Sequence, residues 1–252
     1  MKNDTVSNTS KRLPIVFCLD ISPSMSMNRR IENLNGAIRL FYDELKKDQK
    51  VLNSVEVSVV TFSTNIEENT DFETLDFLVN KKFSVVREGG TNLSTAVLTS
   101  IKKIEDRLVE LDNATIDNYL PFLVLVTDGD PDKTDNQTNL ENAIQSVQRH
   151  CDTSTYPERL IAPYIIGVGE QVAEASLDRF AEKFTGKAII IDGDASYQQN
   201  LFKELFAFIS NSVKNSLRGA GDLKSLYESI QKTSTKQTEI IHRNRNERKK
   251  LL

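Results

Sequence analysis

The most constraining feature of the sequence is an alternation between short apolar runs and longer segments that repeat apolar residues with the helical period. The short runs end at polar or glycine-containing turns, which predicts strands. We expect strands at 13–19, 55–62, 122–126, 160–166 and 188–191, and an edge strand near 83–86. We expect helices around 31–45, 93–108, 140–147, 177–184 and 201–209. Strands that alternate with crossover helices predict an α/β fold, a Rossmann-like open and mainly parallel β-sheet with helices on both faces.

Length and composition agree with one folded domain. The chain has 252 residues, of which 38% are hydrophobic and 27% are charged, and these shares are ordinary for a globular protein. We expect a polar N-terminal extension at 1–12, one domain at 13–217, and a basic, partly helical tail at 218–252. This length is sufficient for a complete apolar core without disulfide support.

Three features of the sequence predict a cytoplasmic location. The longest apolar runs are Leu13–Leu19 and Leu120–Val126, far short of the roughly 20 residues that cross a bilayer, and the N-terminus lacks the apolar core of a signal peptide. The only two cysteines, Cys18 and Cys151, are too few for a disulfide framework. We therefore expect a cytoplasmic protein that has no membrane contact.

Charge is distributed unevenly along the chain. The tail at 218–252 holds nine Lys/Arg and four Asp/Glu, so its net charge is +5 and the remainder of the chain carries −9 of the total of −4. An acidic body repels nucleic acid, so we expect no nucleic-acid binding by the body. Two interpretations of the tail stay open: a frayed, solvated terminus, or a basic helix that docks an acidic partner or a second copy of the chain.

Polar side chains follow the expected strands at the points where ligands bind in an open parallel sheet. The first strand leads into Asp20, Ser22 and Ser24, and the strand 122–126 leads into Asp128. Thr91 follows two glycines and precedes a helix. Because all these donors are oxygens and none is His or Cys, they suit a hard divalent cation.

This set of residues resembles the metal-ion-dependent adhesion site (MIDAS) of von Willebrand factor A (VWA) domains, and the resemblance extends over residues 13–217. It implies that the hydroxyls of Ser22, Ser24 and Thr91 bind the metal. It also implies that Asp20 and Asp128 bind it directly or through water. The implied metal is Mg²⁺ or Mn²⁺, with Ca²⁺ less favoured, and an open coordination position is left for a partner carboxylate.

One departure from the family pattern concerns the loop that carries the serines. The family usually has glycine where this chain has Pro23. Proline fixes φ and removes an N–H, so the shape of the loop is open while its ligands are intact.

Within the family, the chain is similar to the bacterial cytosolic TerY-like branch of tellurite-resistance loci. The similarity rests on 13–16 (LPIV), 60–63 (VTFS) and 89–91 (GGT). It implies a non-enzymatic, metal-dependent adaptor or scaffold in a bacterial stress-response or phage-defence (antiviral) phosphosignalling system. The implied partners are a PP2C-type phosphatase and a Ser/Thr kinase.

Two alternative functions stay open. The first is a metal-dependent hydrolase or phosphatase that uses the same acidic site, with Asp130 or Asp132 as spare carboxylates. A hydrolase needs a base and an activated nucleophile, and the sequence offers no better candidates for these. The second alternative is an adaptor of an AAA+ ATPase.

Other motifs predict no catalytic or organic-cofactor site. Asp128-x-Asp130-x-Asp132 begins like an EF-hand loop, but lysine and asparagine occupy the positions of its required glycine and glutamate. Gly167-x-Gly169 lacks the third glycine of a dinucleotide site. The two histidines, His150 and His242, stand in no nucleophile motif, and Cys151 fits a structural role.

Overall fold

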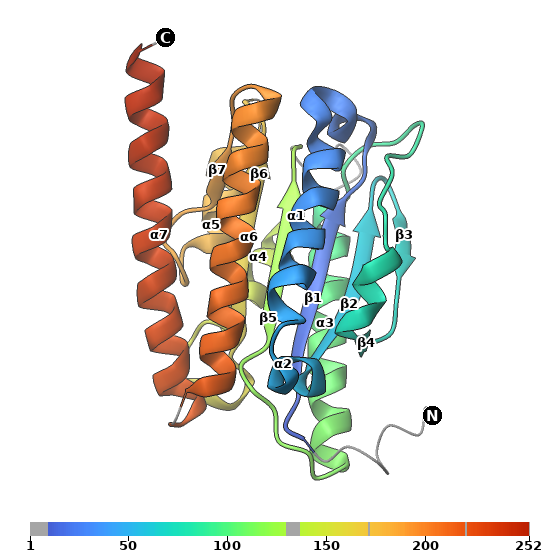
Figure 1. The fold of residues 1–252 in the computed structure, drawn as a ribbon, viewed down its shortest axis with the longest axis vertical. Coiled ribbons are helices and arrows are strands. Elements are labelled where there is room, and N and C mark those ends of the chain that lie inside the picture. The colour runs from blue at the N-terminus through green and yellow to red at the C-terminus, as the bar shows by residue number, and fades with distance from the viewer. Residues whose placement is uncertain (1–9, 130–136, 171, 220, 252) are drawn as a thin grey trace.

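The computed structural model describes residues 10–129, 137–170, 172–219 and 221–251, in which strands and helices alternate (Figure 1). The strands are β1 (Leu13–Asp20), β2 (Val55–Phe62), β3 (Ile66–Asn69), β4 (Glu73–Thr74), β5 (Phe122–Thr127), β6 (Ala162–Val168) and β7 (Ile189–Ile191). The α-helices are α1 (Arg30–Leu45), α2 (Gln49–Ser54), α3 (Leu93–Asn113), α4 (Gln137–Arg149), α5 (Glu174–Ala181), α6 (Ala195–Arg218) and α7 (Leu223–Leu251). Three 3-10 helices occupy Pro23–Arg29, Leu75–Asn80 and Pro157–Arg159.

The strands form one open sheet in the order β3-β2-β1-β5-β6-β7, and β4 also pairs with β2. The strands β2, β1, β5, β6 and β7 are parallel to their neighbours, whereas β3 and β4 run antiparallel to β2. The five parallel strands are buried along their whole length, as expected for strands covered on both faces. The predicted α/β fold class is therefore confirmed.

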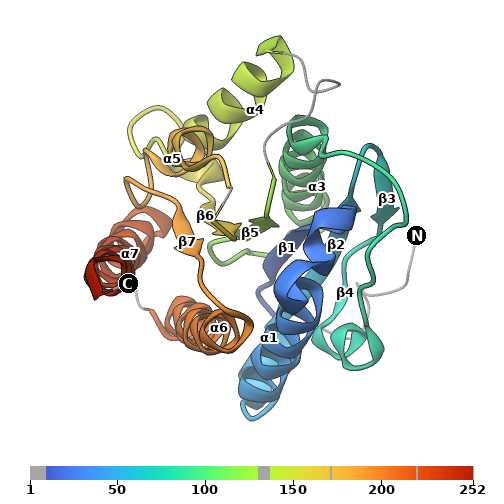
Figure 2. The same ribbon diagram turned by 90° about the horizontal axis from the view of Figure 1, so that it is seen from above.

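Helices cover the two faces of the sheet in two separate layers (Figure 2). Successive side chains of a strand point to opposite faces, so Phe17 and Cys18 of β1 enter different cores. Phe17 packs against Phe41 of α1 and Phe206 of α6, with ring centroids 5.4 and 6.4 Å away. Cys18 lies in the core that α3, α4 and α5 build on the other face. The helices therefore bury both faces of the sheet, and the carboxyl ends of the strands are where ligands bind in such a fold.

The expected edge strand near 83–86 is wrong. This segment has no regular secondary structure, and the edge is formed instead by β3 and β4. Phe83 is buried because it packs against the core, and its backbone pairs with one side chain of α1. Its N–H donates to Asn35 Oδ1 at 2.7 Å, and its carbonyl accepts from Asn35 Nδ2 at 2.8 Å. The apolar residues there serve packing and not strand pairing.

The basic tail forms one helix over 223–251, and this helix, α7, packs beside the sheet edge on the same side as α6 (Figures 1 and 2). Tyr227, Ile230 and Ile241 are buried against the body, and Ser234 Oγ lies 3.0 Å from the hydroxyl of Tyr164 in β6. A frayed terminus is therefore the wrong interpretation, because the helix docks on the acidic body of its own chain. The boundary at 217/218 and docking to a partner stay predictions.

An ion-pair network holds the C-terminal end of α7. Arg245 donates to Asp192 Oδ2 at 2.6 Å and to both oxygens of Glu174 at 2.9 and 2.5 Å. Arg248 donates to Asp192 Oδ1 at 2.6 Å. The hydrogen bonds from Arg245 lower the pKa of Glu174. Burial favours a raised pKa for Asp192, but the hydrogen bonds and charges of Arg245 and Lys249 outweigh it, and the pKa is lowered.

We predict that Arg245→Gln lowers the free energy of unfolding at pH 7 by about 3 kcal/mol, because it leaves buried carboxylate charge less compensated. Denaturant unfolding measures this loss, and Arg243→Gln at an exposed position of the same helix is the matched control. A carboxyl group with a lowered folded pKa contributes stability above its unfolded pKa, and this contribution disappears as the pH falls through the folded value. The difference between wild type and Arg245→Gln should thus shrink below about pH 4. An equal difference at pH 3 and pH 7 would contradict this network.

Candidate metal centre

The topology brings three of the predicted site segments to one edge of the sheet. Asp20 is the last residue of β1, and Asp128 directly follows β5. The two strands are parallel neighbours, with Leu19 opposite Val126. Thr91 lies just before α3, and the backbone N–H of Asn92 donates to Ser63 O at the end of β2. The carboxyl ends of β1, β2 and β5 thus converge.

Asp20 is fully buried and is held by two hydrogen bonds. Its Oδ1 accepts from the backbone N–H of Ser22 at 2.8 Å, and its Oδ2 accepts from the hydroxyl of Thr127 at 2.6 Å. Burial raises the pKa of Asp20 to about 6; the hydrogen bonds from Ser22 and Thr127 oppose this rise, and the charge of Asp128 adds to it. A cation beside Asp20 would favour the ionised carboxylate.

The serine side chains connect this region to the second carboxylate. Ser22 Oγ and Ser24 Oγ lie 3.0 Å apart, and Ser24 Oγ donates to Asp128 Oδ1 at 2.7 Å. Asp20, Ser22, Ser24 and Asp128 are therefore joined in one hydrogen-bonded chain.

Pro23 fits the loop that carries the serines. It is the first residue of the 3-10 helix Pro23–Arg29, where a missing N–H costs nothing because the first N–H groups of a helix have no partner within it. The backbone of Met25 closes the turn by donating to Ser22 O at 3.0 Å. The departure from the family's glycine is thus compatible with the position of both serines.

Thr91 lies against the loop that follows β5. It is 6% exposed, and a Cβ atom placed on Gly129 would lie only 2.8 Å from Thr91 Oγ1. A glycine next to Asp128 therefore leaves room for this hydroxyl. All five predicted residues lie at the same edge, and their role as metal ligands stays a prediction.

Sequence reasoning missed Arg30, the first residue of α1. Its Nη1 donates to Asp128 Oδ2 at 2.6 Å and lies 3.4 Å from Ser24 O. The side chains of Arg30 and Asp128 are 7% and 0% exposed. The sequence held only a weak signal: a positive charge at a helix N-terminus is unfavourable, and a nearby carboxylate reduces this cost.

The donors fit a hard divalent cation. Two carboxylates and three hydroxyls supply only oxygen, which Mg²⁺ and Mn²⁺ accept. Residues 10–129, 137–170, 172–219 and 221–251 contain no group of three or more His, Cys, Asp or Glu that could hold a metal, so this centre would reach its donor number through hydroxyls. Asp130 and Asp132, the spare carboxylates of the hydrolase alternative, lie outside the described residues.

The histidine and cysteine before β6 occupy structural positions. Burial raises the pKa of the free Cys151 thiol to about 12, so it is protonated at neutral pH. His150 is buried, and its ring nitrogens lie 2.6 Å from Arg159 O and 3.0 Å from Glu105 Oε1. Neither side chain contacts the candidate metal centre.

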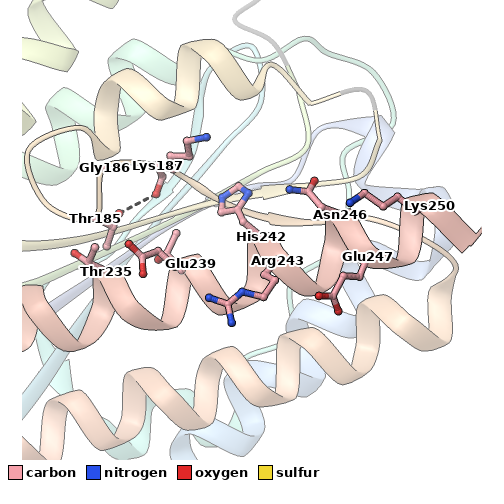
Figure 3. A pocket seen from close by; sticks show the side chains of 11 residues that line it. Thr185, Gly186, Lys187, Thr235, Glu239, His242, Arg243, Asn246, Glu247 and Lys250 are labelled. Carbon is pink, nitrogen blue, oxygen red and sulfur yellow. Dashed lines mark hydrogen bonds between the residues drawn. The ribbon is translucent and has the colours of Figure 1, made fainter.

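A cavity of about 690 Å³ lies away from the five residues, between α7 and the loop that leads into β7 (Figure 3). Lys187, His242 and Lys250 are among its lining residues, and His242 Nε2 contacts Ala188 O at 2.8 Å. None of the predicted metal ligands lines this cavity. In the part of the chain that the structure describes, we find no helix with the length and apolar character needed to span a membrane.

Solved structures share this fold at low sequence identity. A von Willebrand factor type A protein from Catenulispora acidiphila aligns with a TM-score of 0.55 and 19% identity, over 79% of this chain and 42% of that chain. The pilus adhesin SpaC from Lactobacillus rhamnosus GG aligns with a TM-score of 0.54 and 14% identity, over 83% and 31%. Proximal thread matrix protein 1 from the mussel byssus, with a zinc-occupied MIDAS motif, aligns with a TM-score of 0.50 and 14% identity, over 81% and 47%.

The present chain thus spans less than half the length of each of these three structures. No curated protein matches it. The family model of the von Willebrand factor type A domain matches residues 15–206, which include all five candidate ligands. The chain therefore belongs to the von Willebrand factor type A domain family.

Proposed function

We propose that this protein is a non-enzymatic, metal-dependent protein-binding module that holds a partner carboxylate through a divalent cation. VWA domains often mediate protein interactions through a MIDAS metal. The main support for the proposal is the chain of hydrogen bonds that links Asp20 to Asp128 through the two serines, Ser22 and Ser24. Thr91 lies beside this chain. A divalent cation would explain why two carboxylates and three hydroxyls are gathered at one edge of the sheet.

Asp20 and Asp128 would hold the metal directly or through water, and the three hydroxyls would complete its shell. Neutral hydroxyl ligands leave much of the charge of the cation uncompensated, so the bound metal would supply an electrophilic position for an outside carboxylate. The zinc-occupied MIDAS motif of the mussel protein supports a divalent ion as the ligand of such a motif. The oxygen-only donors here favour Mg²⁺ or Mn²⁺ over zinc, which prefers nitrogen and sulfur.

The finer proposal concerns the partners. Resemblance to the TerY-like branch supports a cytoplasmic adaptor in a bacterial stress-response or phage-defence system, with a PP2C-type phosphatase and a Ser/Thr kinase as partners. Capture from native lysate with and without EDTA, followed by mass spectrometry, separates this set from an AAA+ ATPase. Turnover of p-nitrophenyl phosphate with Mn²⁺ that is lost in Asp20→Ala would contradict the non-enzymatic proposal and favour the hydrolase.

We predict that Asp20→Ala weakens Mn²⁺ binding at least tenfold, because it removes one of the two anionic ligands. Isothermal titration calorimetry measures the affinity. Circular dichroism should show a folded protein, since the sheet core supplies most of the stability. Asp106→Ala, which removes an exposed carboxylate on α3, is the control. Unchanged Mn²⁺ affinity in Asp20→Ala would exclude this centre.

Gly129→Ala tests the position of Thr91. The added Cβ would meet Thr91 Oγ1 at 2.8 Å, so we expect the hydroxyl to be displaced and Mn²⁺ affinity to fall about three- to tenfold. Gly36→Ala is the matched control, since its Cβ meets nothing within 4 Å on the exposed side of α1. That control should keep the metal affinity and raise stability by about 1 kcal/mol. Equal Mn²⁺ affinity in Gly129→Ala and Gly36→Ala would argue against Thr91 as a ligand.

Thr91→Ala separates metal binding from partner binding. We expect it to reduce partner capture at saturating Mn²⁺ more than it reduces Mn²⁺ affinity, because the hydroxyl would respond to the incoming carboxylate. Quantitative pull-down at saturating Mn²⁺ and calorimetry with Mn²⁺ provide the two numbers. If Thr91→Ala captures as much partner as wild type does at saturating Mn²⁺, the Thr91 hydroxyl has no role in partner binding.

A further inference from the structure

We propose that Arg30 is a resident cation of the metal centre, which weakens the hold on the divalent ion and makes the loaded centre more attractive to an acidic ligand. This inference rests on the proposed function and extends it to the regulation of the same site. Arg30 lies outside the set of ligands that the family resemblance implies.

The guanidinium group competes with a divalent ion for Asp128. Arg30 Nη1 donates to Asp128 Oδ2 at 2.6 Å, and Ser24 Oγ donates to Oδ1 at 2.7 Å. Both oxygens of this carboxylate are therefore engaged. A divalent ion that binds Asp128 must share it with Arg30 or displace one of these hydrogen bonds.

The surrounding backbone is shaped to hold the guanidinium. Gly169, which follows β6, has a φ of +101°, and a Cβ atom at this position would overlap Nη2 and Cζ of Arg30. The backbone N–H of Gly169 is fixed by a 2.7 Å hydrogen bond to Ile191 O. Gly169 thus makes room for the guanidinium of Arg30, a role unrelated to the incomplete dinucleotide motif in which this glycine stands.

The guanidinium is not saturated by hydrogen bonds. Within the described part of the chain, Arg30 Nε is buried and has no hydrogen-bond partner. Arg30 is thus held at the centre chiefly by the charge of Asp128, and a change in the charge at Asp128 acts directly on it. A buried charge that loses its partner is strongly destabilised.

Formal charges show the consequence. The ionised side chains of Asp20 and Asp128 with Arg30 sum to −1, and a divalent ion changes this to +1. Without Arg30 the same centre changes from −2 to 0. Arg30 therefore lowers the affinity of the centre for the divalent ion, because like charges repel across a poorly screened site. With the ion bound, Arg30 also leaves the centre with a net positive charge, which favours the binding of a carboxylate.

Calorimetry with Mn²⁺ alone on the full chain tests the metal half of the proposal. Arg30→Gln and Arg30→Met remove the charge, and Arg30→Lys keeps it. We expect the two uncharged variants to bind Mn²⁺ at least tenfold more tightly than wild type, and the lysine variant, which keeps the positive charge, to stay within about threefold. Glutamine can still donate to Asp128, so it serves as the test if the methionine variant fails to fold. Arg39→Met, on the exposed face of α1, is the matched control.

A peptide probe tests the ligand half. At saturating Mn²⁺, we expect a fluorescent hexapeptide with a single Glu to bind wild type at least threefold more tightly than Arg30→Gln. An alanine version of the same peptide corrects for binding that does not involve the carboxylate. Equal or tighter peptide binding by Arg30→Gln would overturn this half.

The outcomes separate this inference from the proposed function. Mn²⁺ binding by wild type that Asp20→Ala abolishes, with no gain in either uncharged Arg30 variant, would overturn the inference and leave the metal centre intact. Binding that appears only when Arg30 is replaced would support the inference. Absence of Mn²⁺ binding from wild type and from every variant would contradict both.

Discussion

The structure depends on the burial of carboxylates at the carboxyl ends of parallel strands. Asp20 and Asp128 end or follow the neighbouring strands β1 and β5, and each is at least 95% buried. A buried charge is costly unless hydrogen bonds or an opposite charge compensate it. Ser22, Ser24 and Thr127 supply hydrogen bonds, and Arg30 supplies the charge. The loop after β1, the start of α1 and the glycine after β6 are all arranged around this requirement.

Asp192, the carboxylate after β7, provides an internal comparison. Asp192 pairs with Arg245 and Arg248 of α7, and its pKa is lowered in spite of its burial. Asp20 is held only by neutral donors among the described residues, and burial raises its pKa to about 6. The charge of Asp192 is thus balanced by cationic side chains of its own chain, and these ion pairs help to dock α7. Asp20 lacks a full countercharge, which is the electrostatic basis for our proposal that Asp20 binds a cation from solution.

Much of this arrangement could be predicted from the sequence, because strand ends are marked by the change from apolar to polar residues. Asp20 and Asp128 were found in this way. The position of Arg30 could not be found so easily, because its partner is 98 residues away and depends on how β1 and β5 pair. The segment at 83–86 was misassigned because apolar residues that pack against the core outside a strand give the same sequence pattern as a strand. The packing of α7 on the body could not be predicted from the sequence, because the ion pairs of its second half join Arg245 and Arg248 to carboxylates more than 50 residues away.

The five residues Asp20, Ser22, Ser24, Thr91 and Asp128 are proposed to form one centre for a divalent cation. The most direct test is a crystal structure of the protein grown with Mn²⁺, with anomalous diffraction to locate the metal. We expect one strong anomalous peak among these five residues, with oxygen ligands and an open position toward solvent. A fully ordered edge without an anomalous peak, or a peak held by other residues, would show that these residues are not a metal centre.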